Sequence, residues 1–437
     1  MGNRLSRPLS LPHHHKSDRL SLRRSNPPHP KASVTLPPEV MDKILEHIHV
    51  NGWKSPTLCA CALVATWWTG PSQRRLFSSV KIHPNNYKRW MNGVVLSKSK
   101  AHLLGHVRSL SDIGGYEIRI LARFCGEYLS ALQNLDNLWL YTTTIEHIGE
   151  NEFHTCFSAF RETLTHLSLY GFATSFSAFV TLIDYFPNIT TLQLHSFDLK
   201  PDKRPVPSLS RPLRGKLELS FDYRKANSHE FVNRFAELEL EYEELVIVSP
   251  SSIRREAEIL QSALRVGTST VKFLKVTAEL EREQSLSTLI KTISSPLSGS
   301  RAQTGVAAAI RDFRQLEQLE LAMYFPRFSH KVPLHAITST ELQKIVFSST
   351  NPCVSTLVGC LTEDWVLVDN QLCELLFRLR AMGYRHTLEV ELQFLKVRGN
   401  PEKRGFTKLL PRFREKGIVT VVNAAYGGGL LRTPLHS

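Results

Sequence analysis

The stretch Leu135-Asp136-Asn137-Leu138-Trp139-Leu140 carries leucine at its first, fourth and sixth positions. Side chains of a strand point alternately to its two faces, so Leu138 and Leu140 share one face and Trp139 points to the other. The same apolar spacing recurs at Leu164, Leu167, Leu169; Ile189, Leu192, Leu194; Tyr242, Leu245, Ile247; Val271, Leu274, Val276; Leu316, Leu319, Leu321; and Leu342, Ile345, Phe347. The pattern predicts a series of short strands, each with one buried face.

The distance between copies indicates how these strands are arranged. Partial copies around Leu110, Leu217 and Val390 extend the series, and the steps between central positions are 28, 29, 25, 25, 28, 29, 45, 26 and 45 residues. Seven of these nine steps fall within the period of about 20 to 29 residues that is typical of leucine-rich repeats. One such unit cannot bury its apolar face alone, so we expect the copies to stack into a solenoid.

The segments between the strands predict the remainder of an α/β fold. Helices are expected at Phe153 to Arg161, Phe176 to Tyr185, Glu230 to Glu237, Arg254 to Leu264 and Asn370 to Met382, and a loop insertion at Ser285 to Gly305. The asparagine that usually follows the repeat strand is replaced at Thr143, Phe172, Phe197, Asp222 and Glu279. We therefore expect an irregular solenoid of the leucine-rich-repeat type.

Ligand recognition in such a solenoid belongs to the residues between the buried leucines, because these side chains face solvent. The candidate positions are Asn137, Trp139, His166, Ser168, Thr191, Gln193, Gln318 and Glu320. Trp139 is the most suggestive of them, since tryptophan often anchors protein interfaces. Nothing among these residues specifies a ligand, so the substrate-binding residues stay unassigned.

A compact helical segment precedes the repeats. Leu36-Pro37-Pro38-Glu39 is typical of a helix start, and Val40, Met41, Ile44, Leu45 and Ile48 form an apolar stripe. A second helix is expected from about Thr57 through Trp68, and Gly70-Pro71 is expected to stop it before a third helix that ends at Phe77. Three helices in about 45 residues bury little apolar surface by themselves.

These residues closely resemble the F-box motif in order and spacing. The resemblance rests on Leu36-Pro37, Ile44-Leu45, Leu58, the stretch Cys61 to Trp67, and Arg75-Leu76-Phe77. It departs from the motif at Ala65, where cysteine or serine is common, and in the long loop from Val50 to Pro56. F-box motifs dock on a Skp-type adaptor, which in turn holds a cullin scaffold. The resemblance implies that Leu36, Pro37, Ile44, Leu45, Leu58, Val64 and Trp67 divide between the core of the motif and the adaptor contact.

The domain organisation follows from these segments: a basic tail over residues 1–35, an F-box over 36–80, and the repeat region over 81–437. The tail is rich in Pro, Ser, His and Arg and is expected to be disordered. Its start, Met1-Gly2-Asn3-Arg4-Leu5-Ser6, fits the pattern for myristoylation of Gly2, and the arginines that follow would attract anionic lipid. Chance occurrence and a nuclear-import patch are the alternatives.

The overall composition excludes several classes of protein. No apolar run approaches the eighteen or so residues of a membrane helix, which favours an intracellular protein of the cytoplasm or nucleus, with membrane contact only through the tail. The formal charge is +14, of which the tail supplies +6; the remainder spreads over a long chain and predicts no nucleic-acid partner. Phosphate loops, nucleophile elbows, CxxC pairs and HExxH are missing, so we expect no enzyme, no metal and no cofactor.

Together the two signals indicate the substrate-recognition subunit of a Skp-cullin-F-box ubiquitin ligase. Its partners would be the adaptor, through it a cullin, and a protein substrate held near a charged ubiquitin-conjugating enzyme. Three alternatives stay open: a repeat scaffold without a ligase role whose helices cap the solenoid, a basic nucleic-acid-binding protein, and a hydrolase on an unrecognised fold.

Overall fold

The computed structural model describes residues 36–48, 56–64, 66–113, 132–141, 154, 157–171, 173–200, 208–221, 228–238, 240–250, 256–266, 269–279, 308–322, 334–349, 362–395, 410–424 and 430–434. It divides the chain into two compact units, residues 1–47 and 48–437. This division falls inside the segment that resembles an F-box. The predictions for Gly2, the tail and the insertion at Ser285 to Gly305 lie outside the described residues.

The first unit contributes helix α1 (Pro38–Glu46). Pro37 precedes the helix as its N-cap, Pro38 occupies the first turn where its missing N–H costs nothing, and Glu39 complements the positive helix end. Met41 and Leu45, four residues apart on one side of α1, are buried. The helix start expected from the sequence is confirmed.

The second unit begins with helices α2 (Pro56–Val64) and α3 (Thr66–Phe77), which pack against each other. The prediction that Gly70-Pro71 stops the second helix was wrong, because Pro71 lies inside α3. Proline disfavours a helical residue before it mainly by a clash with that residue's Cβ, and Gly70 has none. Helix α3 instead begins at Thr66 and continues to Phe77.

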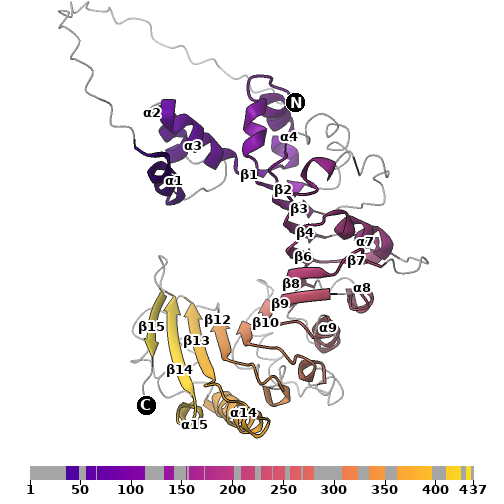
Figure 1. Ribbon diagram of the computed structural model, residues 1–437, viewed down its shortest axis with the longest axis vertical. Coiled ribbons are helices and arrows are strands. Elements are labelled where there is room, and N and C mark those ends of the chain that lie inside the picture. The colour runs from indigo at the N-terminus through magenta and orange to yellow at the C-terminus, as the bar shows by residue number, and fades with distance from the viewer. Residues whose placement is uncertain are drawn as a thin grey trace, which may run out of the picture. The chain divides into compact units, whose positions relative to one another are not determined.

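A sheet of thirteen strands dominates the second unit (Figure 1). In sheet order the strands are β1 (Ser79–Lys81), β2 (Ser109–Ile113), β3 (Asn137–Tyr141), β4 (His166–Tyr170), β6 (Thr191–His195), β8 (Leu213–Ser220), β9 (Leu240–Pro250), β10 (Phe273–Glu279), β11 (Gln318–Ala322), β12 (Lys344–Ser349), β13 (Glu389–Leu395), β14 (Ile418–Ala424) and β15 (Leu430–Pro434). All described pairs are parallel except β14 with β15. Strands β5 (Ala173–Ser175) and β7 (Asp198–Lys200) form a separate parallel pair.

The register of this sheet confirms the repeat. The central positions Leu110, Leu138, Leu167, Leu192, Leu217, Leu245, Leu274, Leu319, Ile345 and Val390 pair with one another in an unbroken row across the sheet. Val80 on β1 and Val419 on β14 extend the row at its two ends. All of these side chains are buried. The chain therefore folds as a solenoid-type parallel sheet, with one strand for each copy of the motif.

Helices cover one side of the sheet (Figure 1). They are α7 (Phe176–Tyr185), α8 (Ser228–Phe235), α9 (Glu256–Leu264), α14 (Thr362–Ala381) and α15 (Pro411–Arg414). Helix α7 has the predicted bounds, because Ser175 caps it by accepting a hydrogen bond from the Ala178 N–H at 3.3 Å. Of the predicted helix Phe153 to Arg161, the described part contains the 3₁₀ turn η6 (Ser158–Phe160).

Short elements complete the described structure. Helix α4 (Pro84–Trp90) continues into the π-helical turn η2 (Met91–Val95), and the 3₁₀ helix η3 (Ala101–His106) leads to β2. Another 3₁₀ turn, η7 (Leu334–Ala336), precedes β12 and contacts α14.

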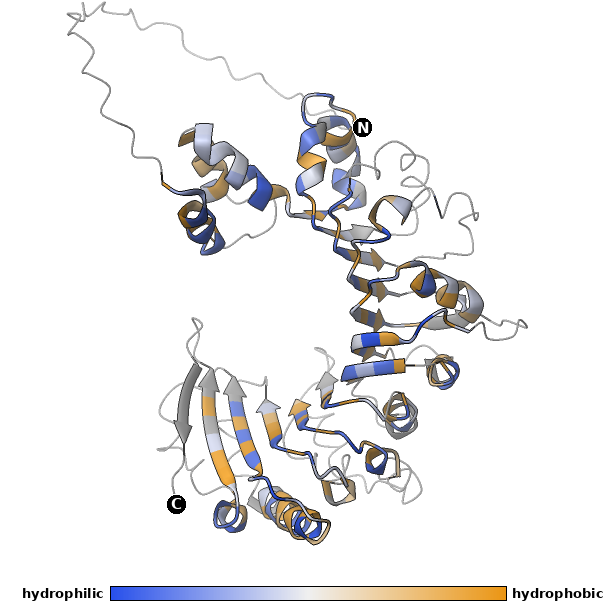
Figure 2. Cartoon of the chain, viewed as in Figure 1, coloured by the Kyte–Doolittle hydropathy of each residue, from blue (hydrophilic) through white to orange (hydrophobic). Residues whose placement is uncertain are grey.

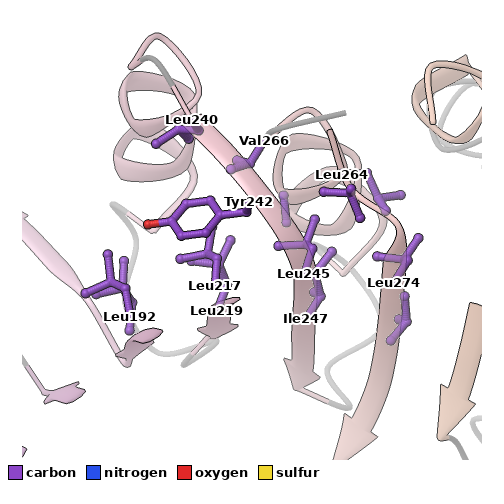
Figure 3. Close-up of a cluster of buried hydrophobic side chains, with 14 of the residues drawn as sticks. Leu192, Leu217, Leu219, Leu240, Tyr242, Leu245, Ile247, Leu264, Val266 and Leu274 are labelled. Carbon is purple, nitrogen blue, oxygen red and sulfur yellow. The ribbon is translucent and has the colours of Figure 1, made fainter. Parts of the chain in front are cut away.

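The core lies between the sheet and its helices, and the strands alternate in hydropathy along their length (Figure 2). Tyr242 takes the first apolar position of its copy and lies among Leu217, Leu240 and Leu245 (Figure 3). Its hydroxyl has no hydrogen-bond partner among the described residues, and complete burial raises the pKa of this phenol. The core is otherwise aliphatic and phenylalanine-rich, as the repeat requires.

Candidate functional site

The side of strands β3, β4, β6 and β8 that lies opposite the helices presents two rows of side chains. The first row runs through the residue between the two buried leucines of each strand: Trp139, Ser168, Gln193 and Glu218. The second row lies two residues further along each strand: Tyr141, Tyr170, His195 and Ser220. Because the strands are parallel and in register, residues 25 to 29 positions apart in sequence become direct neighbours.

Four of these residues form a continuous aromatic surface, which we call the aromatic ladder: Trp139, Tyr141, Tyr170 and His195. The ring centroids of Tyr141 and Tyr170 are 4.6 Å apart, and those of Tyr170 and His195 are 4.1 Å apart, with nearly parallel planes in both pairs. Trp139 stacks on Tyr170 from the first row at 5.7 Å. Tyr170 thus contacts every other member, and the rings hold one another in place.

A row of hydrogen bonds runs beside the ladder. The Ser168 hydroxyl donates to Oε1 of Gln193 at 2.6 Å, and Nε2 of Gln193 donates to Oε2 of Glu218 at 3.1 Å. The bond from Ser168 fixes the orientation of the Gln193 amide, which must then direct its NH₂ group to the carboxylate. Both hydrogen bonds of this row are therefore donated in the same direction, from Ser168 towards Glu218, and the row ends on the Glu218 carboxylate.

His195 joins the two rows and is uncharged at neutral pH. Its Nε2 lies 3.6 Å from Oε1 of Glu218, which is too long for a hydrogen bond. Burial lowers the pKa of His195 to about 4, because the charged imidazolium would lose its hydration. The contact with Glu218 is therefore not an ion pair at pH 7. Burial, together with Tyr141 and Glu218, raises the pKa of Tyr170 to about 12, so this phenol stays protonated.

Several buried polar atoms at the ladder lack a hydrogen bond to any described residue. They are Nε1 of Trp139, Oδ1 of Asn137 and Nε2 of His195. A buried polar group without a partner costs free energy that a bound molecule recovers when it supplies the missing donor or acceptor. The surface thus combines flat aromatic area with specific unsatisfied polar atoms, a combination that suits recognition of a protein segment.

On the later strands, the same side of the sheet carries ion pairs. Lys216 contacts Glu244 at 2.6 Å, Lys275 contacts Glu320 at 2.7 Å, and Lys344 pairs with Glu391. The predicted ligand-facing residue Glu320 also accepts a hydrogen bond from the Ser348 hydroxyl at 3.2 Å. Gln318 and Glu320 lie on β11 and so belong to this ion-paired part, away from Trp139.

The sequence predicted part of the ladder and missed the rest. Trp139, Ser168 and Gln193 were candidates and lie together, and His166 and Thr191 flank them at the starts of their strands. The expectation that Ser168 faces solvent was wrong, because Ser168 lies between Trp139 and Gln193 in the row and is 2% exposed. Tyr141, Tyr170 and His195 were not identified. The sequence did contain the pattern that identifies them, because each follows the second buried leucine of its copy. Since side chains alternate between the two faces of a strand, all three point to the outward side.

The residues predicted to contact an adaptor occupy different environments in the two units. In the first unit Leu36 is half-buried, Pro37 is exposed, Ile44 is 41% exposed and Leu45 is buried. In the second unit Leu58 is buried, Val64 is 73% exposed, and Trp67 contacts Trp68 with ring centroids 5.4 Å apart. Leu45 and Leu58 are thus core residues, whereas Pro37, Ile44 and Val64 face solvent.

Within the described ranges, no group of three or more His, Cys, Asp or Glu side chains could hold a metal ion. No helix of the described residues is long and apolar enough to cross a membrane.

Comparisons with known proteins add little to this description. The chain matches no protein-family model and no curated protein sequence. Among solved structures it is similar to the leucine-rich repeat-containing protein LegL7 from Legionella pneumophila, with 13% sequence identity and a TM-score of 0.38, covering 82% of this chain and 89% of that one. A likeness at this level carries no conclusion about function. The repeat assignment rests on the strand register of the chain itself.

Proposed function

We propose that this chain is a substrate-recognition subunit of a Skp-cullin-F-box type ubiquitin ligase and that the aromatic ladder binds the recruited protein. In this role the chain catalyses nothing itself and binds no cofactor. It raises the effective concentration of a target lysine near a ubiquitin-conjugating enzyme held by the partner subunits. The observation that carries the recognition half is the stacking of Trp139, Tyr141, Tyr170 and His195 on the side of the sheet opposite the helices.

The ladder has the properties of an interface anchor. Stacked rings lose little conformational entropy on binding, because their neighbours already fix them. Glu218 and the unpaired atoms of Trp139 and His195 supply the polar contacts that distinguish one partner from another. Tryptophan and tyrosine are also the residues that most often dominate binding energy at protein interfaces.

The adaptor half of the proposal rests on the F-box resemblance and on exposed aliphatic side chains. Ile44 on α1 and Val64 on α2 lie at motif positions and face solvent, and Leu63 beside Val64 is 87% exposed. Exposed aliphatic side chains within a helical motif are typical of a surface that a partner covers. They support the proposal without naming the partner.

Co-purification of the full chain with a Skp-type adaptor tests this half directly. The double variant Ile44→Glu with Val64→Glu is expected to abolish binding, because two carboxylates would be buried without partners. The matched control is Val366→Glu with Phe377→Glu, which changes two exposed apolar residues of α14 by the same charge. If the adaptor binds neither the unaltered chain nor the control, the ligase role is wrong.

The recognition half has its own test. A proximity-labelling comparison between the full chain and Tyr170→Ala would identify proteins whose recovery depends on the ladder, because Tyr170 contacts its other three members. The control is Lys275→Ala in the ion-paired part of the same side. Partners lost with Lys275→Ala but kept with Tyr170→Ala would place recognition on the later strands.

A repeat scaffold without a ligase role is the second candidate, and one observation favours it. Helix α3 packs against η3 and is followed directly by β1, and Ser72 and Leu76 of α3 are buried. Helix α3 therefore lies against η3 and the first strand at the start of the sheet, as a solenoid cap would. Failure to bind the adaptor, combined with partners that depend on the ladder, would make this candidate the better one.

A further inference from the structure

Outside the tail, the positive charge of the chain is concentrated in one part of the sequence. The expectation that this charge spreads evenly along the chain was wrong. Residues 47–111 contain nine Lys or Arg and no Asp or Glu. Residues 112–437 contain 37 Lys or Arg and 36 Asp or Glu, so the strands that follow are almost neutral. An acid-free run of 65 residues within a folded unit differs from the balanced surface that most soluble domains carry.

The fold brings much of this charge together. Arg74 and Arg75 lie near the end of α3, and α3 packs against η3. The backbone N–H of Arg108 donates to the Ser78 carbonyl at 2.9 Å, which joins the segment after η3 to the end of α3. Burial, Arg74 and His102 all lower the pKa of His106, so these cationic groups are close enough to repel its proton.

We define the basic surface as Arg74, Arg75, Lys98, Lys100, His102 and Arg108. Lys98, Lys100 and Arg108 are exposed, and none of the three has an ion pair among the described residues. Lys81, Lys88 and Arg89 on the neighbouring β1 and α4 add three more exposed cations. Residues 47–111 contain no carboxylate, and among the described residues Lys98, Lys100 and Arg108 keep their charge available for an external anion.

We propose that the basic surface on α3 and η3 docks the chain on membranes rich in anionic phospholipid. Each Lys or Arg near such a leaflet contributes about fivefold to the membrane partition coefficient, and the contributions act over about 10 Å at moderate ionic strength. The seven basic residues of the preceding tail carry charge of the same sign and strengthen the attraction. Docking of this kind is independent of any ligand at the aromatic ladder.

An exposed aliphatic side chain favours a membrane over a nucleic acid as the partner. Leu96 is 45% exposed and lies two residues before Lys98. A lipid leaflet accepts aliphatic groups beneath its charged headgroups, whereas a phosphate backbone offers them nothing. The basic residues also come from short helical turns and loops, and not from a long helix that would enter a major groove.

Co-sedimentation of the full chain with vesicles tests the proposal. Vesicles of phosphatidylcholine with about one third phosphatidylserine are expected to bind the chain, and phosphatidylcholine alone is not. The variant Lys98→Glu, Lys100→Glu, Arg108→Glu is expected to bind the anionic vesicles about a hundredfold more weakly, since it loses three contributions of about fivefold. High salt should weaken binding of the unaltered chain.

The matched control carries Arg311→Glu, Arg314→Glu and Arg385→Glu, which are exposed and change the net charge equally. It keeps the tail and the basic surface, so its binding should equal that of the unaltered chain. Equal losses in the two variants would mean that net charge alone governs binding and would overturn the assignment. So would an unchanged vesicle affinity of the first variant together with loss of its binding to single-stranded RNA, which would identify a nucleic-acid surface instead.

Discussion

The side of the sheet opposite the helices is aromatic on β3, β4 and β6 and carries ion pairs from β8 to β13, although both parts stand on the same repeated core. In the aromatic part the rings of Tyr141, Tyr170 and His195 satisfy one another by stacking and leave polar atoms unpaired. In the ion-paired part Lys275 and Lys344 are already occupied by neighbouring carboxylates. The difference teaches that a uniform repeat permits two kinds of surface, one of stacked rings and one of ion pairs.

The largest expected effect comes at the boundary between the two parts, where the β8–β9 register shifts at Gly215. Gly215 has φ +88°, and a Cβ there would lie 2.2 Å from the Thr190 carbonyl oxygen. We expect Gly215→Ala to lower the free energy of unfolding by about 4 kcal/mol, since it adds a backbone clash to a strained φ. Urea denaturation measures this. Gly93→Ala, where nothing lies within 4 Å, should change stability by less than about 1 kcal/mol.

In the ion-paired part, the stability that an ion pair contributes should depend on the burial of that pair more than on the number of pairs. The Glu391 side chain is 4% exposed, so Lys344→Ala would leave a buried carboxylate short of its cation and should cost about 3 kcal/mol. The Arg214–Glu241 pair is close, at 2.7 Å, but exposed, and Arg214→Ala should cost less than about 0.5 kcal/mol. Similar costs for the two substitutions in thermal or urea unfolding would contradict this account.

The aromatic part should respond to acid through His195. Its pKa is lowered to about 4 in the folded chain, so below the unfolded value of about 6.5 the unfolded state binds the extra proton. This contribution to stability is present near neutral pH and is lost as the pH falls from about 6.5 to 4. Because the His195 ring keeps partial contact with solvent, the expected loss of stability is limited to about 2 kcal/mol. His195→Phe keeps the stack and should remove this part of the pH dependence; an unchanged pH profile would mean that His195 does not titrate in this way.

The smallest effect tests the core that both parts share. The Tyr242 hydroxyl is buried without a partner among the described residues, so Tyr242→Phe removes an unpaired polar group. We expect stability to rise by up to about 1 kcal/mol. A clear loss of stability in the same denaturation assay would contradict this prediction, because it would mean that the Tyr242 hydroxyl makes a stabilising contact.

The sequence by itself determined the repeat. Each LxxLxL copy sets one strand and one buried face through local alternation, and the central positions from Leu110 to Val390 predicted the register of ten strands. The same local logic fixed the bounds of α7 and the start of α1. It was wrong at Gly70-Pro71, because Gly70 lacks the Cβ with which the ring of Pro71 would clash, and α3 continues through both residues. The acid-free run from residue 47 to residue 111 can also be identified from the sequence, because charged residues can be counted without knowing the structure.

Only the tertiary structure decided which outward residues act together. Trp139, Tyr170 and His195 are separated by 25 residues or more, and a shift of one position in any strand would separate their rings. Whether Ile44 or Leu45 faces solvent likewise depends on packing, since both are aliphatic and adjacent. Sequence periodicity specifies which face of an element is apolar, but stacking and burial depend on what other elements place against it.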